Sequence, residues 1–168
     1  INRSTDGATW EETGTSAQRT FAGPAQATHR RNNFDDDGAR LLSYGPTLMI
    51  AVHDETNAAV DIHYSVNPEV ASPTFTAGAV IPSGSGPKAF VRWKDTFSSP
   101  PTDSPVLVTA EGIYRVDAAG TTFDLIYELD GDPNTGRWAT VGLDGDLYVG
   151  LGSGDLIALH ADLAGQVI

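Results

Sequence analysis

Residues 138–160 read WATVGLDGDLYVGLGSGDLIALH. Three short apolar runs in this stretch are separated by turns rich in Gly and Asp, which is typical of antiparallel strands joined by tight hairpins. The stretch predicts strands at 138–143, 146–150 and 155–160. From residue 39 onward the rest of the chain repeats this pattern of short β-branched and aromatic runs between Gly, Pro, Asn and Asp.

The predicted strands fall into groups of four. The first group is expected at 40–44, 47–53, 59–66 and 74–81. The second group is expected at 89–94, 105–109, 112–117 and 123–129. A last strand, beginning at Gln166, adds to the group that opens at Trp138. The period of roughly 40–50 residues with four strands per unit is the spacing of propeller blades.

These groups predict an all-β chain and, more finely, part of a β-propeller. Residues 39–168 are expected to form three consecutive four-stranded antiparallel blades, the last of them incomplete. Residues 1–38 are expected to hold the end of an earlier blade and a long polar connection over 15–37. A closed propeller has about 4–8 blades. We therefore expect further blades of a longer chain, or neighbouring subunits, to complete the stack.

The segment Ser4-Thr5-Asp6-Gly7-Ala8-Thr9-Trp10 resembles the Asp-box, a turn motif of sialidase-like propellers, although it is one residue shorter than the commonest spacing. In such a turn the Asp caps backbone amides, Gly accepts a positive φ and Trp packs between strands. The resemblance implies a structural role at the edge of a blade. The residues that carry it are Ser4, Asp6, Gly7, Thr9 and Trp10.

A second resemblance covers residues 146–165, whose strand, Gly turn and strand are similar to blades of quinoprotein-type propellers. The two resemblances together span about a quarter of the chain. Both imply a fold, and neither implies a reaction.

The composition narrows the classes of partner. The chain of 168 residues has 22 Asp and Glu against 10 Lys and Arg, a formal net charge of −12. Such acidity opposes binding to nucleic acid, which requires cations that neutralise phosphates. It fits either a protein of a salt-loving organism or a high-GC genome. The chain has no Cys, and no apolar run approaches the roughly 18 residues of a membrane span.

Catalysis is a weaker hypothesis for this sequence than binding. A sialidase-like site uses three arginines to hold a carboxylate, a Tyr–Glu pair and an Asp. Nothing in the sequence gathers such a set, and a Gly-x-Ser-x-Gly nucleophile motif is also absent. The glycines around Ser85 and Ser153 are better explained by turns than by a phosphate cradle. Candidate side chains are the arginines at 40, 92, 115 and 137 and the tyrosines at 44, 64, 114, 127 and 148.

Calcium is the only cofactor that the sequence suggests. Asp130, Asp132 and Asn134 place oxygen side chains at alternate positions of a Gly-containing turn, and 33–38 has a similar pattern. Neither has the acidic residue expected at the twelfth position, so a solvated acidic turn is the favoured alternative. Among the histidines at 29, 53, 63 and 160, His53 and His63 lie on neighbouring predicted strands, where one alternative is that they face each other as part of a zinc site. Because a third protein ligand is missing, an ordinary pair on the strand surface is the favoured interpretation.

The three tryptophans, Trp10, Trp93 and Trp138, recur near blade boundaries and are expected to pack between blades rather than to stack on sugars. Together these features predict a non-enzymatic recognition or scaffold module that binds a protein receptor or a glycan on an extracellular or virion surface. The alternatives are a glycoside hydrolase whose catalytic residues lie outside this chain, and a purely structural subunit of an assembly. Membrane insertion is not expected.

Overall fold

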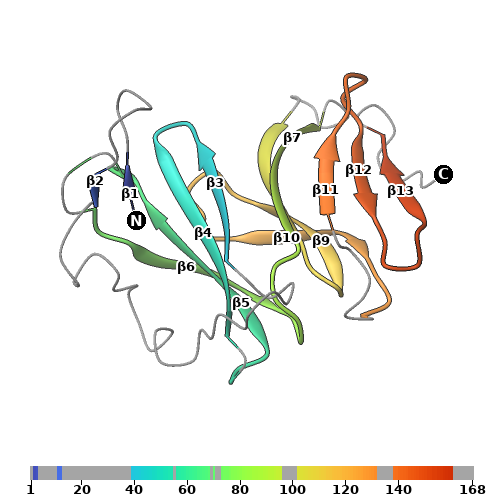
Figure 1. The fold of residues 1–168 in the computed structure, drawn as a ribbon, viewed down its shortest axis with the longest axis horizontal. Helices are drawn as coiled ribbons and strands as arrows, with labels where there is room; N and C mark the ends of the chain where they lie inside the picture. Colours follow the sequence, from blue (N-terminus) through green and yellow to red (C-terminus); the bar gives the residue numbers. More distant parts are fainter. Residues whose placement is uncertain are drawn as a thin grey trace.

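The computed structural model describes residues 2–3, 11–12, 39–54, 56–68, 70, 73–95, 102–131 and 138–160. Every regular element among these residues is a β-strand, which confirms the all-β prediction (Figure 1). Strands β1 (Asn2–Arg3) and β2 (Glu11–Glu12) pair in antiparallel fashion. They flank the predicted Asp-box, whose own residues lie outside the described part of the chain.

The other strands form three antiparallel sheets in chain order. The first sheet contains β3 (Arg40–Tyr44), β4 (Thr47–Asp54), β5 (Ala59–Ser65) and β6 (Thr76–Pro82). The second sheet contains β7 (Ala89–Asp95), β8 (Thr102–Val108), β9 (Gly112–Val116) and β10 (Phe123–Glu128). The third sheet contains β11 (Trp138–Val141), β12 (Leu147–Gly150) and β13 (Leu156–Leu159). The predicted groups therefore coincide with the sheets, and the strand predicted from Gln166 lies outside the described residues.

The largest boundary difference is at β8, which begins three residues before the predicted start at Pro105. A proline ends a strand when its missing N–H is needed in the ladder. Pro105 pairs with Arg92 of β7, whereas the pairing of β8 with β9 begins one residue later, at Val106. Because Pro105 lies beyond that second ladder, β8 continues through it.

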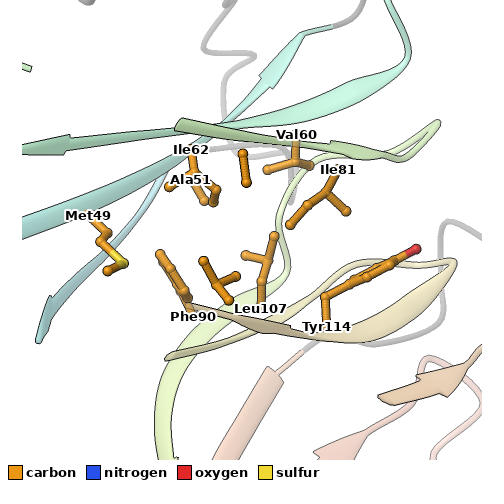
Figure 2. Packing of buried hydrophobic residues seen from close by; sticks show 10 residues of the cluster. Met49, Ala51, Val60, Ile62, Ile81, Phe90, Leu107 and Tyr114 are labelled. Atoms are coloured by element: carbon orange, nitrogen blue, oxygen red, sulfur yellow. The ribbon is translucent and has the colours of Figure 1, made fainter. Parts of the chain in front are cut away.

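The second sheet lies between the other two, and its strands β7, β8 and β9 contribute buried residues to a core on each face. Phe90 and Leu107 point toward the first sheet, where they meet Met49 and Ile62 (Figure 2). Alternate residues of the same strands point the other way and join a second core with the third sheet. Members of this second core are Ala89, Trp93, Val106, Val108, Ile113, Leu147, Val149, Ile157 and Leu159. Sheet stacking of this kind requires strands that are apolar on both sides, as β8 is.

A backbone contact locks the first sheet to the second. The register of β5 and β6 shifts between Asp61 and His63, so Ala79 is outside the ladder at a β-bulge. Its N–H donates instead to the carbonyl of Gly120 in the β9–β10 turn, at 2.8 Å. Gly120 has a φ of +77°, and a Cβ on neighbouring Gly78 would lie 2.1 Å from the Gly120 oxygen. The close approach therefore requires glycine at position 78.

The β9–β10 turn is held by Asp117. Its carboxylate accepts hydrogen bonds from the amides of Thr121 and Thr122 and from the Thr121 hydroxyl, which is 2.9 Å away. Partial burial raises the pKa of Asp117, but these hydrogen bonds together outweigh it, and the net pKa is lowered.

An Asp117→Asn variant is expected to lose stability at neutral pH and to lose progressively less as the pH falls below about 4. The lowered pKa means that the ionised carboxylate contributes stability above its ordinary pKa, and this contribution disappears as the pH falls through the folded value. Urea unfolding of both proteins between pH 7 and pH 2 checks this. A stability difference that stays constant over that range would contradict the assignment.

The part of the chain that the structure describes contains no helix that is long and apolar enough to cross a bilayer.

Candidate functional site

The connections between sheets bring polar side chains together at one end of the stack. The loop 83–88 leads from β6 to β7, and its first amide, at Ser83, donates to the carbonyl of Ala58 in the β4–β5 turn. Its last amide, at Lys88, donates to the carbonyl of Val108, where the β8–β9 turn begins. We call this region the loop end. Its polar side chains come from Ser83, Ser85, Lys88, Thr109 and Glu111.

Glu111 is the central carboxylate of the loop end. Its Oε2 lies 2.5 Å from the Ser83 hydroxyl, and its Oε1 accepts the Gly84 amide at 2.8 Å. The Ser83 hydroxyl is also 2.6 Å from the Ser85 carbonyl, so its single proton is shared between two acceptors. Both oxygens of Glu111 therefore hold the glycine-rich loop in place.

The β8–β9 turn is equally well fixed. The Thr109 hydroxyl accepts the amides of Glu111 and Gly112, and the Ala110 amide donates to the Ser85 hydroxyl at 3.4 Å. The carbonyl of Glu111 accepts the amide of Leu129, just beyond β10. A site built on these loops is ordered before any ligand arrives, which reduces the entropy cost of binding.

A Ser83→Ala variant is expected to lose roughly 1–3 kcal/mol of stability, because it removes the hydroxyl bonded to a carboxylate that stays partly buried. Equilibrium denaturation measures the loss. Ser153→Ala is the matched control, since that hydroxyl bonds Asp155 on the exposed β12–β13 turn and its removal should change stability by less than about 0.5 kcal/mol. Equal effects at the two positions would show that Ser83 does not anchor the loop.

Two basic side chains and a histidine lie at the same end. Arg40 at the start of β3 donates from Nε to the carbonyl of Lys88 at 2.9 Å. Lys88 itself is buried. His53 lies near the end of β4 on the face that packs against the second sheet, because Met49 and Ala51 on that face belong to the shared core.

The opposite end of the stack holds a second polar group between the first two sheets. Arg92 of β7 forms an ion pair with Asp103 of β8 and lies over the Tyr44 ring, 5.4 Å from its centroid. The Tyr44 hydroxyl donates to the carbonyl of Asp103. The hydrogen bond from Arg92, with its charge, lowers the pKa of Asp103 despite some desolvation. These contacts fasten the edge strand of the first sheet to the second sheet.

The third sheet has two paired side-chain contacts at this opposite end. The Tyr148 hydroxyl donates to Asp144 at 2.6 Å, and His160 Nδ1 lies 2.5 Å from Asp146 Oδ2. The hydrogen bond to Asp144 raises the pKa of Tyr148. Desolvation is the main cause of the raised pKa values of Tyr44 and Tyr114. Because all three pKa values are raised above the ordinary value for tyrosine, the three phenols are protonated at neutral pH.

The candidate arginines are not brought together. Arg40 lies at the loop end and Arg92 at the opposite end, whereas Arg115 on β9 is on the side of the second sheet that faces the third. Arg137 is outside the described residues. A three-arginine carboxylate clamp is therefore not formed by the arginines that the structure describes.

The expectation that His53 and His63 face each other is wrong. They lie on adjacent strands, but His53 pairs with Val60 and His63 pairs with Ile50. Because side chains alternate along a strand, this register places the two histidines on opposite faces of the first sheet. In the described part of the chain, no three His, Asp or Glu side chains cluster in a way that could hold a metal ion.

The calcium hypothesis stays a prediction. Asp132, Asn134 and the 33–37 segment lie outside the described residues. Asp130 follows β10 on the loop end, next to Gly131, whose amide donates to the Ala110 carbonyl at 3.1 Å.

The tryptophans differ from one another. Trp93 is 4% exposed in the core between the second and third sheets, and its Nε1 donates to the Gly145 carbonyl at 2.9 Å, so its predicted packing role is confirmed. Trp138 is 50% exposed and lies against Gly150 on the face of the third sheet that is turned away from the second sheet, so its packing between blades stays a prediction. Trp10 is outside the described residues.

Sequence reasoning missed the loop end. It assigned 84–86 to a turn and gave Glu111 no role, because Glu111 stands alone between two strands. The available signal was the pair of serines flanking Gly84 together with an acidic residue in the next hairpin. Only the fold brings these segments together.

The fold and the contacts at the loop end define a class: an all-β protein of stacked antiparallel sheets with polar loops gathered at one end. Comparisons with protein-family models, with curated proteins and with solved structures find no match to this chain.

Proposed function

We propose that this chain is part of a β-propeller that works as a non-enzymatic recognition or scaffold module. The observation that carries the proposal is the relation between the sheets. The first strands β3, β7 and β11 contact one another in succession, while consecutive sheets pack face to face. Blades arranged around a common axis have this relation, because only their first strands approach the axis.

The ligand is proposed to be a protein receptor or a glycan, bound at the loop end. In a propeller the loops carry recognition while the sheets supply a rigid frame. The loop end fits this division, because its glycine-rich loop is held by hydrogen bonds to Glu111 and by the Ala110 amide, which donates to the Ser85 hydroxyl. The acidity of the chain suits a soluble module on an extracellular or virion surface and disfavours nucleic acid as a partner.

Binding is favoured over catalysis by the described side chains. The described arginines at 40, 92 and 115 lie at different places in the stack and so form no three-arginine clamp for a carboxylate. The glycoside hydrolase alternative would need catalytic residues from outside the described part of the chain.

A glycan array combined with a turnover assay on fluorogenic glycosides tests the proposal. Thr56 is exposed on the β4–β5 turn at the loop end, and Asn67 is exposed after β5 at the opposite end. We expect Thr56→Lys to weaken binding to the array by at least tenfold and Asn67→Lys, which adds the same charge, to leave it unchanged. Binding that is insensitive to Thr56→Lys would contradict the proposal that the ligand binds at the loop end. Turnover of a glycoside would favour the glycoside hydrolase alternative.

A further inference from the structure

Two aromatic rings lie on the face of the third sheet that is turned away from the second sheet, here called the outward face. Leu147 and Val149 belong to the core with the second sheet, so Tyr148 and Gly150, which alternate with them, lie on the outward face. Trp138 pairs with Gly150 and shares this face. A Cβ on Gly150 would be 2.3 Å from the indole nitrogen, so the indole lies directly on the glycine while 50% of Trp138 stays exposed.

The Tyr148 ring lies on a glycine in the same way. A Cβ on Gly142 would be 2.7 Å from Cε2 of Tyr148. The Tyr148 hydroxyl donates to one carboxylate oxygen of Asp144 at 2.6 Å, and the other oxygen accepts the Asp146 amide at 3.1 Å. The hydrogen bond from Tyr148, together with that amide, lowers the pKa of Asp144, so the carboxylate is charged at neutral pH. A negative charge therefore lies at the hydroxyl edge of the Tyr148 ring.

The third sheet supplies no lysine or arginine to balance the charge of Asp144. Residues 138–160 contain three aspartates and neither Lys nor Arg. His160 lies 2.5 Å from Asp146 and is engaged there. Among the described residues, the hydrogen bonds to Asp144 come from neutral donors, and each carboxylate oxygen can accept two. Charge complementarity therefore favours a cationic partner on the outward face.

The contact between the first two sheets shows how such a tyrosine and carboxylate are completed. Tyr44 of the first sheet donates to the carbonyl of Asp103, whose carboxylate pairs with Arg92 of the second sheet. The Arg92 guanidinium also lies over the Tyr44 ring, 5.4 Å from its centroid. An arginine of one sheet thus covers a tyrosine of the preceding sheet and pairs with a carboxylate beside it. The outward face has the tyrosine and the carboxylate, and a following sheet is the place from which the arginine would come.

We propose that the outward face docks the next sheet of the proposed propeller, and that this sheet brings an arginine over Tyr148 and against Asp144. A second side chain of the same partner strand packs on Trp138. Side chains two positions apart along a strand are separated by about 6.6 Å, close to the roughly 7–8 Å expected between the diagonal neighbours Tyr148 and Trp138. The inference rests on the proposed propeller and names the chemistry of the sheet that continues it.

A peptide titration of the intact chain tests this contact. The probe is acetyl-Leu-Gly-Arg-Gly-Leu-amide, which carries an arginine with an apolar side chain two positions away on either side. The control peptide has citrulline in place of arginine, which keeps the shape and removes the charge. The indole N–H signal of Trp138 in nitrogen-15 NMR reports binding and is assigned with Trp138→Phe. We expect saturable shifts, with a dissociation constant at least about fivefold lower for the arginine peptide.

Asp144→Asn should abolish the preference for arginine, because it removes the charge and keeps an oxygen that accepts hydrogen bonds. Asp155→Asn is the matched control, since it removes the same charge from the exposed β12–β13 turn and should keep the preference. The proposal is overturned if the natural chain binds neither peptide or binds both equally, or if Asp144→Asn still prefers arginine. The glycan array probes the loop end, so either test can fail while the other succeeds.

Discussion

A Gly78→Ala variant is expected to lose about 3 kcal/mol of stability or more. The added Cβ would lie 2.1 Å from the Gly120 carbonyl oxygen, and real Cβ atoms do not approach backbone that closely. The β9–β10 turn would have to move away, which breaks the 2.8 Å hydrogen bond from the Ala79 amide. Overpacking typically costs about 1–3 kcal/mol, and an unsatisfied buried amide adds roughly 1–3 kcal/mol. Urea unfolding followed by circular dichroism measures the sum.

The matched control is Gly84→Ala. The nearest atom to a Cβ at Gly84 is a side-chain oxygen of Glu111 at 3.4 Å, which is an ordinary contact. This substitution should change stability by less than about 1 kcal/mol. If both variants were equally stable, the contact between the first sheet and the β9–β10 turn would not exist in solution.

Removing the ring of Trp93 should have a comparable effect on the other interface. Trp93→Ala is expected to cost about 3–5 kcal/mol, the usual range for a buried large aromatic side chain. Trp93 fills the core between the second and third sheets and donates a hydrogen bond to Gly145 in the β11–β12 turn. Trp93→Phe retains most of the packing and loses the hydrogen bond, so it should cost about 1–2 kcal/mol.

Trp138→Ala serves as the control for the same chemical change. Half of the Trp138 side chain is exposed, so its removal should cost less than about 1.5 kcal/mol. The difference between the two tryptophans can be measured by denaturation, with the fluorescence of the remaining tryptophans as the signal. A larger loss at Trp138 than at Trp93 would mean that the third sheet packs through its other face.

Strand positions were the most predictable feature of this chain. Alternation and turn residues located every strand from β3 to β13 because both signals are local. The start of β8 was missed because a strand can contain a proline only where the missing N–H is not needed for pairing, and this depends on the neighbouring strand. The propeller itself stays a prediction, because ring closure depends on contacts beyond single strands. The Asp-box residues and most of the calcium turn lie outside the described part of the chain.

The site was less predictable than the fold. The sequence shows a histidine at position 53, but its burial depends on the sheet that packs against β4, and its separation from His63 depends on the strand register. Glu111 and Ser83 are 28 residues apart and meet only because the first and second sheets stack. Trp93 is buried whereas Trp138 is half exposed, and this difference in exposure likewise depends on which face of a sheet packs against another sheet. Such information is tertiary, and no single segment carries it.

The second sheet shares its two faces with two cores, and this gives the chain a gradient of resistance to opening. Amide hydrogens in β8 and β9 should exchange with solvent only when the whole stack unfolds, while those of the third sheet, covered on one face by the second, should exchange through partial opening. The turn that carries Glu111 connects β8 to β9 and therefore belongs to the slowest-exchanging layer. The loop end is thus anchored to the layer of the molecule that is expected to open least readily.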